Sequence, residues 1–239
     1  PIHFQWYGEL IDKVFGKVGP TEPSITSLIV KEPIGVVAGI VPWNFPLMMA
    51  VWKMAPALAT GCSVIIKPAE DTPLTAIRVA KIAQEAGIPD GVLNVLPGYG
   101  DVGEALGRHK DVDAVSFTGS TAVGKMIGEV CGRNLVSASL ELGGKNPPLV
   151  MPSANIDNAV EGAYWGGFGT AGQRCTSLGN LILHKDIYDE FMEKFMAKVK
   201  STTIGDSLHQ EGVLYGPMLS EKYAKDFLTG VDMCNASGA

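Results

Sequence analysis

The sequence predicts an α/β protein: a parallel, doubly wound, Rossmann-like sheet, followed by the start of a second α/β domain. Short apolar segments alternate with helical patterns over residues 34–145, as in the right-handed βαβ units of a parallel sheet. The first of these segments, 34–41, is a continuous apolar run, which is typical of a strand buried on both faces. The 239 residues include 29 Gly and 15 Pro, a surplus that predicts many tight turns.

The elements of this sheet follow one another in a regular order. After the first strand, a helical pattern covers residues 46–60 and ends before Gly61. The Asp-Thr-Pro segment at 71–73 supplies a cap and a first-turn proline for a helix that ends at Gly87. The remaining strands are expected at 63–67, 92–96, 112–117 and 137–142, and the remaining helices at 102–106 and 120–131.

The flanking segments are less regular. Before the sheet, a short helix is expected at 7–15 and a strand at 27–32. After it, the pattern predicts a helix at 155–166, a polar loop at 169–176, a strand at 178–184 and an amphipathic helix at 187–199. These changes divide the chain into three parts: residues 1–33, 34–145 and 146–239.

The composition disfavours several classes of protein. The 19 Lys and Arg against 25 Asp and Glu give a net charge of −6, and the lack of a long basic run disfavours nucleic-acid binding. No stretch approaches the roughly 18 to 20 uninterrupted apolar residues of a membrane span. The four cysteines show no paired spacing, which favours a reduced, cytoplasmic compartment. The start lacks a signal-peptide pattern and an initiator Met, and we expect a piece of a longer chain.

The segments that follow the predicted strands are rich in Gly and polar residues. In a parallel sheet, ligands bind beyond the carboxyl ends of the strands. The segments at those ends are Pro42-Trp43-Asn44, Lys67-Pro68-Ala69-Glu70, Pro97-Gly98, Thr118-Gly119-Ser120 and Glu141-Leu142-Gly143-Gly144. We therefore expect the functional site at this edge of the sheet.

The segment from Gly119 to Lys125 suggests a phosphate site. It spells G-x-x-x-x-G-K at a change from strand to helix, but Met126 stands where a P-loop needs Ser or Thr to hold magnesium. What remains is a helix N-terminus with Ser120 at its start, where the dipole and free N–H groups suit a phosphate. The alternative is an ordinary Gly-Ser helix start.

One cysteine differs from the others. Cys62, Cys131 and Cys234 are expected to be small, buried hydrophobic residues. Cys175 follows Arg174 in a polar, glycine-bearing loop, where a thiol can be exposed and activated, although an inert thiol is an equal alternative. The four histidines are scattered, so neither a zinc site nor a Cys–His pairing is supported.

Two further residues at strand ends carry suitable chemistry. Glu141, beside two glycines, could be desolvated and act as a base, or it could pair with Lys145. Asn44, at a strand-to-helix corner, is a neutral donor suited to an oxyanion, although such a residue alone is more often a helix cap.

Together and in this order, these motifs resemble the aldehyde dehydrogenase superfamily, hydrolytic type, from about Tyr7 to Gly216. Each string alone is only suggestive, whereas five in register with the family's spacing make coincidence very improbable. The five are Pro42-Trp43-Asn44-Phe45-Pro46, Lys67-Pro68-Ala69-Glu70, Phe117-Thr118-Gly119-Ser120-Thr121, Leu140-Glu141-Leu142-Gly143-Gly144-Lys145 and Gly172-Gln173-Arg174-Cys175.

The resemblance implies the catalytic roles of three residues. Cys175 is the thiolate that adds to the aldehyde carbon and forms a thiohemiacetal, then a thioester. The Asn44 amide and the Cys175 backbone N–H hold the oxyanion. Glu141 activates the water that releases a carboxylic acid, and its presence separates the hydrolytic type from relatives that pass the acyl group to coenzyme A.

The resemblance also implies a nicotinamide cofactor. Lys67 and Glu70 would bind the adenosine ribose hydroxyls and Ser120 the pyrophosphate. A Glu70 carboxylate would repel a 2′-phosphate, so NAD is preferred, although NADP-using relatives can carry the same residue. The full set of cofactor-binding candidates is Val41, Pro42, Trp43, Lys67, Glu70, Gly98, Phe117, Gly119, Ser120, Val123 and Leu142.

By the same resemblance, residues 1–33 form an oligomerisation arm and leading segment, 34–145 a partial NAD-binding domain and 146–239 a partial catalytic domain. A homodimer or homotetramer is implied, and the substrate is expected to be a small aliphatic aldehyde or an amino- or semialdehyde. Arg174 beside the nucleophile suggests an acidic aldehyde, unless its side chain points away. Since family members are much longer, the 239 residues alone are expected to be poorly active.

Two other readings compete with this one. A non-catalytic relative that keeps the fold is disfavoured by the intact Cys175, Glu141 and Asn44. A phosphate-binding NTPase built on residues 119–125 is disfavoured by Met126 and by the lack of a second magnesium-ligand motif.

Overall fold

The computed structural model describes residues 2–238. The chain forms two compact units, Pro1–Leu142 and Gly143–Ala239. Among the described residues, no helix combines the length and the apolar character that crossing a bilayer requires. The functional names given above to the parts of the chain stay predictions.

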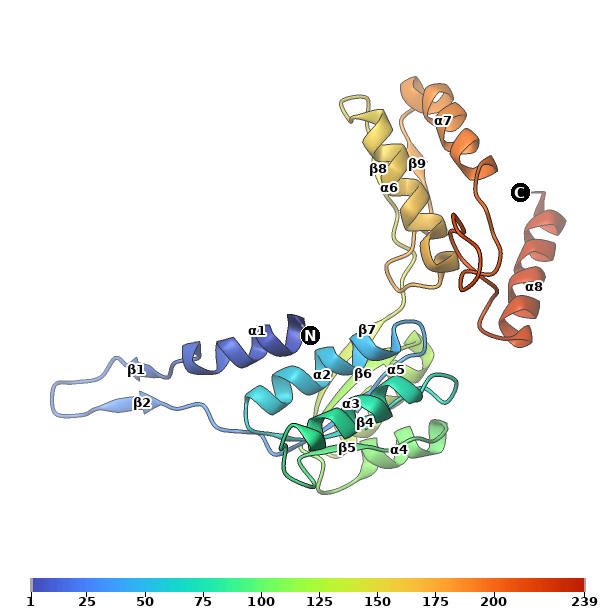
Figure 1. Ribbon diagram of the computed structural model, residues 1–239. Coiled ribbons are helices and arrows are strands. Elements are labelled where there is room, and N and C mark those ends of the chain that lie inside the picture. The colour runs from blue at the N-terminus through green and yellow to red at the C-terminus, as the bar shows by residue number, and fades with distance from the viewer. Residues whose placement is uncertain (1, 239) are drawn as a thin grey trace. The chain divides into compact units, whose positions relative to one another are not determined.

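The first unit is built on a five-stranded parallel sheet with the strand order β5-β4-β3-β6-β7 (Figure 1). Its strands are β3 (Val36–Ile40), β4 (Ser63–Lys67), β5 (Leu93–Val95), β6 (Ala114–Gly119) and β7 (Ser137–Leu142). The predicted α/β fold with a parallel sheet is therefore confirmed. The bounds of β4 and β7 are those expected from the sequence.

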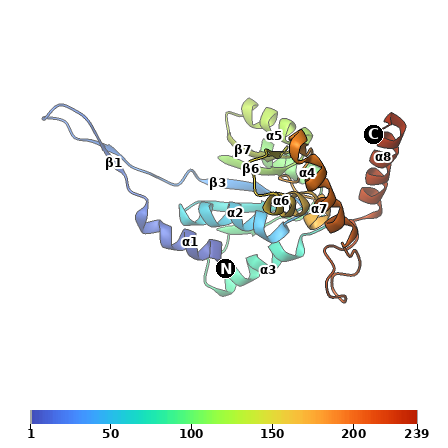
Figure 2. The ribbon, with the colours of Figure 1, turned by 90° about the horizontal axis from the view of Figure 1, so that it is seen from above.

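Helices cover both faces of this sheet (Figure 2). The helices α2 (Pro46–Ala59) and α3 (Leu74–Glu85) lie on one face, and α4 (Gly100–Arg108) and α5 (Thr121–Arg133) on the other. Val64 and Ile66 of β4 are fully buried against the first pair, while Ile65 packs toward the second. The burial of both faces explains why these strands are apolar at successive positions rather than at alternate ones.

Some predicted bounds of this unit are wrong. The helix α3 begins at Leu74, and its N-cap residue, Pro73, makes no side-chain cap hydrogen bond, so the predicted Asp-Thr cap at 71–72 is absent. The helix α4 extends beyond the predicted 102–106 at both ends, because its glycine and charged terminal residues add no apolar periodicity.

The leading segment also differs from expectation. Instead of a helix at 7–15, α1 (Ile2–Leu10) is followed by a 3-10 turn (Ile11–Lys13). The strand β1 (Lys17–Gly19), which the sequence did not predict, pairs antiparallel with β2 (Ser27–Ile29). This hairpin stands away from the sheet (Figure 1). The strand β2 is the first part of the strand expected at 27–32, whereas the short and mostly exposed β1 has no burial pattern that would make it recognisable.

The second unit is smaller and mainly helical. It contains β8 (Leu149–Val150), α6 (Ile156–Phe168), a 3-10 turn (Gly169–Gly172), β9 (Ile182–Leu183), a second 3-10 turn (Lys185–Ile187), α7 (Tyr188–Lys200) and α8 (Glu221–Ser237). The predicted strand at 178–184 shrinks to β9, because Gly179 and Asn180 interrupt it and Leu178 forms only an isolated bridge with Asn146.

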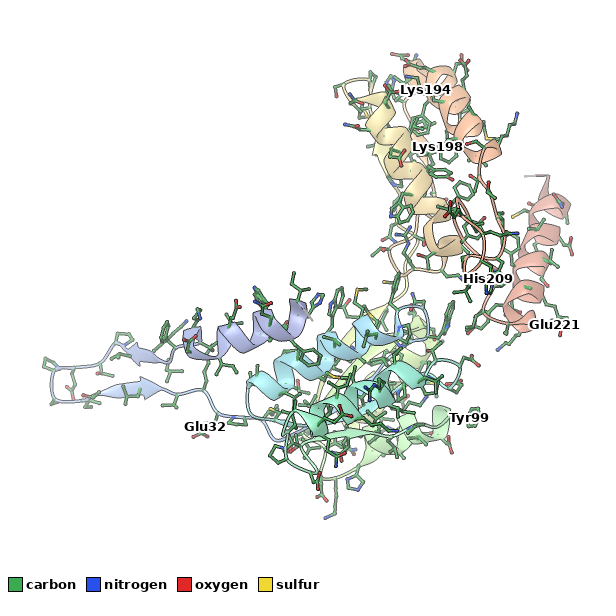
Figure 3. The ribbon with its side chains drawn as sticks, viewed as in Figure 1. Glu32, Tyr99, Lys194, Lys198, His209 and Glu221 are labelled. Atoms are coloured by element: carbon green, nitrogen blue, oxygen red, sulfur yellow. The ribbon has the colours of Figure 1, made fainter. Side chains whose placement is uncertain are left out.

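The helices α6 and α7 pack against each other around Phe191, which is fully buried. On the surface of this pair, Lys194 and Lys198 lie one turn apart along α7 (Figure 3). Lys194 Nζ lies 2.7 Å from an Asp157 oxygen of α6, and Lys198 forms an ion pair with Glu161. Such exposed pairs add little stability, so the apolar contact holds the two helices together.

Candidate active site

The order of the strands creates a site at one edge of the sheet. The chain proceeds from β3 through β4 to β5, then crosses to β6 and β7 on the other side of β3. Ligands of doubly wound sheets bind at such a change of direction, beyond the carboxyl ends of the strands. The segments after β3, β4 and β6 are therefore those in which the sequence analysis placed Asn44, Glu70 and Ser120.

The corner after β3 presents Asn44. Val41 N–H donates to the Lys67 carbonyl at 3.1 Å, which ties the end of β3 to the end of β4. Pro42, Trp43 and Asn44 are half-buried. The N-cap residue of α2 is Phe45 rather than Asn44, and it makes no side-chain cap hydrogen bond.

The end of β4 carries an ion pair. Lys67 Nζ lies 3.3 Å from Glu70 Oε2; the lysine side chain is only 6% exposed, whereas that of Glu70 is 46% exposed. A buried lysine that holds a half-exposed carboxylate fixes a donor and an acceptor side by side. An ammonium group donates hydrogen bonds and a carboxylate accepts them, so the pair could bind the hydroxyl groups of a ligand.

The start of α5 has the features of a phosphate site. Ser120 is its N-cap, and its hydroxyl oxygen accepts a hydrogen bond from Val123 N–H at 3.3 Å. A Cβ at Gly119 would lie 2.5 Å from the Phe117 ring, and one at Gly98 would lie 2.4 Å from Val102. A side chain at either position would require Phe117 or Val102 to move, and glycine lets a ligand approach the backbone closely. With the Lys67–Glu70 pair, these residues fit a dinucleotide.

The face of the sheet that α2 covers holds a residue that the sequence analysis missed. Lys53 of α2 is 8% exposed, and its Nζ donates to Ser116 Oγ at 3.1 Å and to Thr118 Oγ1 at 2.8 Å, both on β6. Burial lowers the pKa of Lys53 to about 8, although the negative charge of Glu141 opposes the change. The signal was present in the sequence: Lys53 interrupts the apolar run at 47–58.

Glu141 lies beside this lysine. In the parallel pairing of β6 with β7, Glu141 is opposite Thr118, and so it shares the face on which Lys53 lies. Its side chain is exposed. The desolvation considered for Glu141 from the sequence stays a prediction, and within this unit its neighbours include Thr118 and the buried ammonium group of Lys53.

Cys175 lies in the second unit and is exposed, as expected for a reactive thiol. The turn before it has three successive residues in the left-handed region, Thr170, Ala171 and Gly172, with φ values of 57°, 54° and 68°. Two of these are not glycine, and such strain persists where the surroundings hold it, often at functional sites.

The Arg174 side chain turns toward α6. Its guanidinium lies over the Trp165 ring, 5.5 Å from the ring centroid, and donates to the Trp165 carbonyl. Its Nε is buried without a hydrogen-bond partner among residues 2–238. Of the two interpretations of Arg174 above, the geometry matches the one in which the side chain is engaged within the protein.

The other cysteines are partly as predicted. Cys62 and Cys131 are buried, and burial raises the pKa of the Cys131 thiol. The prediction that Cys234 is buried is wrong, because α8 buries none of its residues in this structure. Among the described residues, no group of three or more His, Cys, Asp or Glu is arranged to hold a metal ion.

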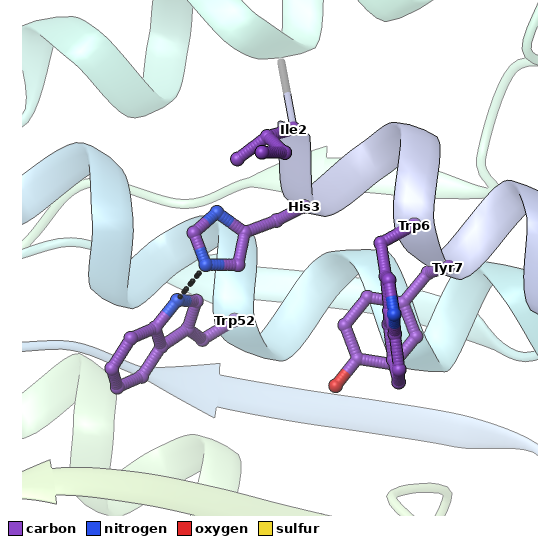
Figure 4. A pocket seen from close by; sticks show the side chains of 5 residues that line it. All are labelled: Ile2, His3, Trp6, Tyr7 and Trp52. Atoms are coloured by element: carbon purple, nitrogen blue, oxygen red, sulfur yellow. Dashed lines mark hydrogen bonds between the residues drawn. The ribbon is translucent and has the colours of Figure 1, made fainter.

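A cavity of about 490 Å³ lies between α1 and α2 and is lined mainly by aromatic side chains (Figure 4). Trp52 Nε1 donates to His3 Nε2 at 2.9 Å, and Trp6 meets Tyr7 edge to face with ring centroids 4.7 Å apart. The remaining lining residue is Ile2. The aromatic lining suits an apolar group rather than a charged one.

The candidate catalytic residues are divided between the units. Asn44 and Glu141 belong to the first unit and Cys175 to the second. Their meeting at one site, and the role of each cofactor-binding candidate, stay predictions.

Comparisons with known proteins point to one family over almost the whole chain. The model of the "Aldehyde dehydrogenase family" matches residues 2–239. A phenylacetaldehyde dehydrogenase of Pseudomonas fluorescens is 46% identical over 93% of the chain, which spans 45% of that relative. Two similar solved structures are PnpE in complex with nicotinamide adenine dinucleotide (45% identity, TM-score 0.95) and an indole-3-acetaldehyde dehydrogenase complexed with NAD⁺ (42% identity, TM-score 0.96). Each match covers 99% of this chain and 48% of the other, so the chain spans about half the length of these relatives.

Proposed function

The chain belongs to the aldehyde dehydrogenase family, as its motifs indicated, and we propose that its protein oxidises an aldehyde to the carboxylic acid with NAD. The observation that carries this proposal is the exposed Cys175 on its strained turn. An exposed thiol next to a constrained backbone is available to a carbonyl group, whereas the thiols of Cys62 and Cys131 are not.

In the proposed mechanism, the Cys175 thiolate forms a bond to the aldehyde carbon, and the carbonyl electrons move to the oxygen. The Asn44 amide and the Cys175 N–H donate hydrogen bonds to this oxyanion. A nicotinamide bound at the sheet edge would supply the hydride acceptor, so that collapse of the oxyanion breaks the carbon–hydrogen bond and leaves a thioester on Cys175. Glu141 then takes a proton from water, the hydroxide adds to the thioester carbon, and the thiolate leaves with release of the acid.

NAD is proposed in preference to NADP. The half-exposed Glu70 carboxylate beside Lys67 would accept a hydrogen bond from a ribose hydroxyl and would repel a phosphate at the same place. Replacing Glu70 with Gln keeps a hydrogen-bonding group and removes the charge. We expect Glu70→Gln to lower the KM for NADP relative to that for NAD, and an unchanged ratio would contradict the assignment.

The substrate proposed is a neutral aldehyde with an aliphatic or aromatic tail. Because Arg174 is engaged with Trp165, it gives no reason to favour an acidic semialdehyde. The aromatic cavity between α1 and α2 supports an apolar tail, as do two relatives named for phenylacetaldehyde and indole-3-acetaldehyde. An amino- or semialdehyde, expected from the sequence, is the alternative that a panel of aldehydes would test.

The function is tested by mixing the protein with NAD and an aldehyde and measuring the absorbance of the NADH that forms. Cys175→Ala should abolish it, while Cys234→Ala, which also removes an exposed thiol, should not. Activity retained in Cys175→Ala would refute the mechanism. ATP hydrolysis without NADH formation would favour the phosphate-site alternative at residues 119–125.

Assembly and location are also proposals. The β1–β2 hairpin exposes Val18, Leu28 and Ile29, which supports its role as an arm that another subunit covers in a homodimer or homotetramer. A cytoplasmic location is supported by the four cysteines, all of which are free. Size-exclusion chromatography with light scattering tests the first proposal, since a monomer would contradict it.

A further inference from the structure

The Cys175 loop is attached to the rest of the second unit on both sides of the cysteine. On one side, Arg174 reaches α6 through the face and the carbonyl of Trp165. On the other, Asn146 Nδ2 donates to the carbonyls of Cys175 at 2.9 Å and Ser177 at 3.1 Å. The proposed mechanism assigns no role to Arg174 or Asn146, and the only role considered for Arg174 above was recognition of an acidic aldehyde.

The contact of Arg174 with α6 has a specific physical basis. Trp165 lies in the last turn of α6, whose carbonyls carry the negative end of the helix dipole, so a guanidinium there is favoured. The ring beneath it adds a cation–π interaction.

The chain leaves room for this guanidinium at Gly169. A Cβ at Gly169 would lie 2.7 Å from Arg174 Nη2 and 3.1 Å from the Trp165 ring. The backbone of Gly169 is not left-handed, so the turn itself does not require glycine at this position. The Arg174–Trp165 contact thus explains why position 169 is a glycine.

We propose that Arg174 and Asn146 are positioning residues that fix Cys175 for attack on the aldehyde, and that Arg174 does not bind substrate. The inference rests on the proposed role of Cys175. Two non-glycine residues in left-handed conformations make the loop prone to relax, and a shift of about 1 Å in a nucleophile can cost about 100-fold in rate. Arg174, the residue before the cysteine, is anchored to α6, and Asn146 binds the carbonyl of Cys175 itself. Together these two contacts limit the relaxation of the loop.

The experiment compares two glycine substitutions on α6 and its end. Gly169→Ala displaces the guanidinium but keeps Arg174, and Gly162→Ala is the matched control because nothing lies within 4 Å of its added Cβ. We expect Gly169→Ala and Arg174→Met to lower kcat by about 10- to 100-fold. Arg174→Lys should recover part of this loss, because an ammonium group can still lie at the end of α6. Gly162→Ala should retain the wild-type kcat.

The substrate pair butanal and succinic semialdehyde, which differ by a terminal carboxylate, separates positioning from recognition. A positioning role predicts the same loss of kcat for both aldehydes, with KM nearly unchanged. A rise in KM for succinic semialdehyde alone would overturn the proposal and make Arg174 a substrate-binding group, and unchanged kinetics in Gly169→Ala and Arg174→Met would also overturn it. If Arg174→Met fails to fold, Gly169→Ala and Arg174→Lys decide the question.

Asn146 is tested in the same way. Asn146→Asp keeps the shape of the side chain but replaces the donor with an acceptor that faces two carbonyls. We expect a loss of kcat for both aldehydes, and wild-type kinetics would contradict the second attachment. Failure of the proposed function is distinct from these results, since it would appear as NADH formation that survives in Cys175→Ala.

Discussion

Lys53 makes the stability of the first unit depend on pH in a way that can be calculated. Its ammonium group is 8% exposed, and its hydrogen-bond partners are the neutral hydroxyls of Ser116 and Thr118. Burial lowers the pKa from 10.5 to about 8. The unfolded chain binds the Lys53 proton more tightly than the folded chain does, so protonation of Lys53 opposes folding. This free-energy penalty is present in full below pH 8 and fades as the pH rises toward 10.5. The two pKa values correspond to a penalty of about 3 kcal/mol at neutral pH.

The variant Lys53→Met removes this titration and keeps a similar apolar volume. It also leaves the two hydroxyls of β6 without their donor, at a cost that does not change with pH. The free energy of unfolding of each protein is measured in urea at several values from about pH 7 to about pH 10. Relative to Lys53→Met, the wild type should gain about 2.5 kcal/mol over this range, most of it above pH 8, because part of the penalty remains at about pH 10.

Subtracting the variant's curve from that of the wild type removes the titration of all other groups. Lys81→Met, at an exposed lysine of α3, is the matched control for replacing a lysine by methionine. A difference between wild type and Lys53→Met that is constant with pH would refute the reasoning, since the ammonium group would then be as well solvated in the fold as in the unfolded chain.

Two further predictions concern packing and accessibility. Gly124→Ala should destabilise the first unit by about 1–3 kcal/mol, because the new Cβ would lie 2.3 Å from a Leu142 methyl group. Gly132→Ala in the same helix meets nothing within 4 Å and should be neutral or stabilising by up to about 1 kcal/mol, so equal effects in urea unfolding would contradict the close contact. Native alkylation followed by peptide mass spectrometry should modify the exposed thiols of Cys175 and Cys234, while the two buried thiols should react only after unfolding. Rapid native labelling of a buried thiol would contradict the packing described.

The parts of the fold that the sequence predicted well are those in which burial decides the structure. The strand β4 has the predicted bounds because its apolar residues face two helical layers and turn signals delimit it. The hairpin strand β1 (Lys17–Gly19) has no such pattern, since it is only three residues long and mostly exposed. Cys234 shows the converse error: a helical pattern in α8 predicted burial, but a helix face is buried only if something packs against it.

Some residues of the candidate site could be predicted from the sequence and others could not. Asn44, Glu141 and Ser120 could be found from the sequence because a parallel sheet brings the ends of its strands to one edge, so their positions follow from strand order alone. Lys53 reaches the site from the middle of a helix, and its partners on β6 are more than sixty residues away in the sequence. The direction of the Arg174 side chain depends on Trp165, nine residues earlier, and on the room left by a glycine at position 169. Strand order can therefore indicate which groups meet a ligand, whereas the residues that hold those groups in place are found only from the packing around them.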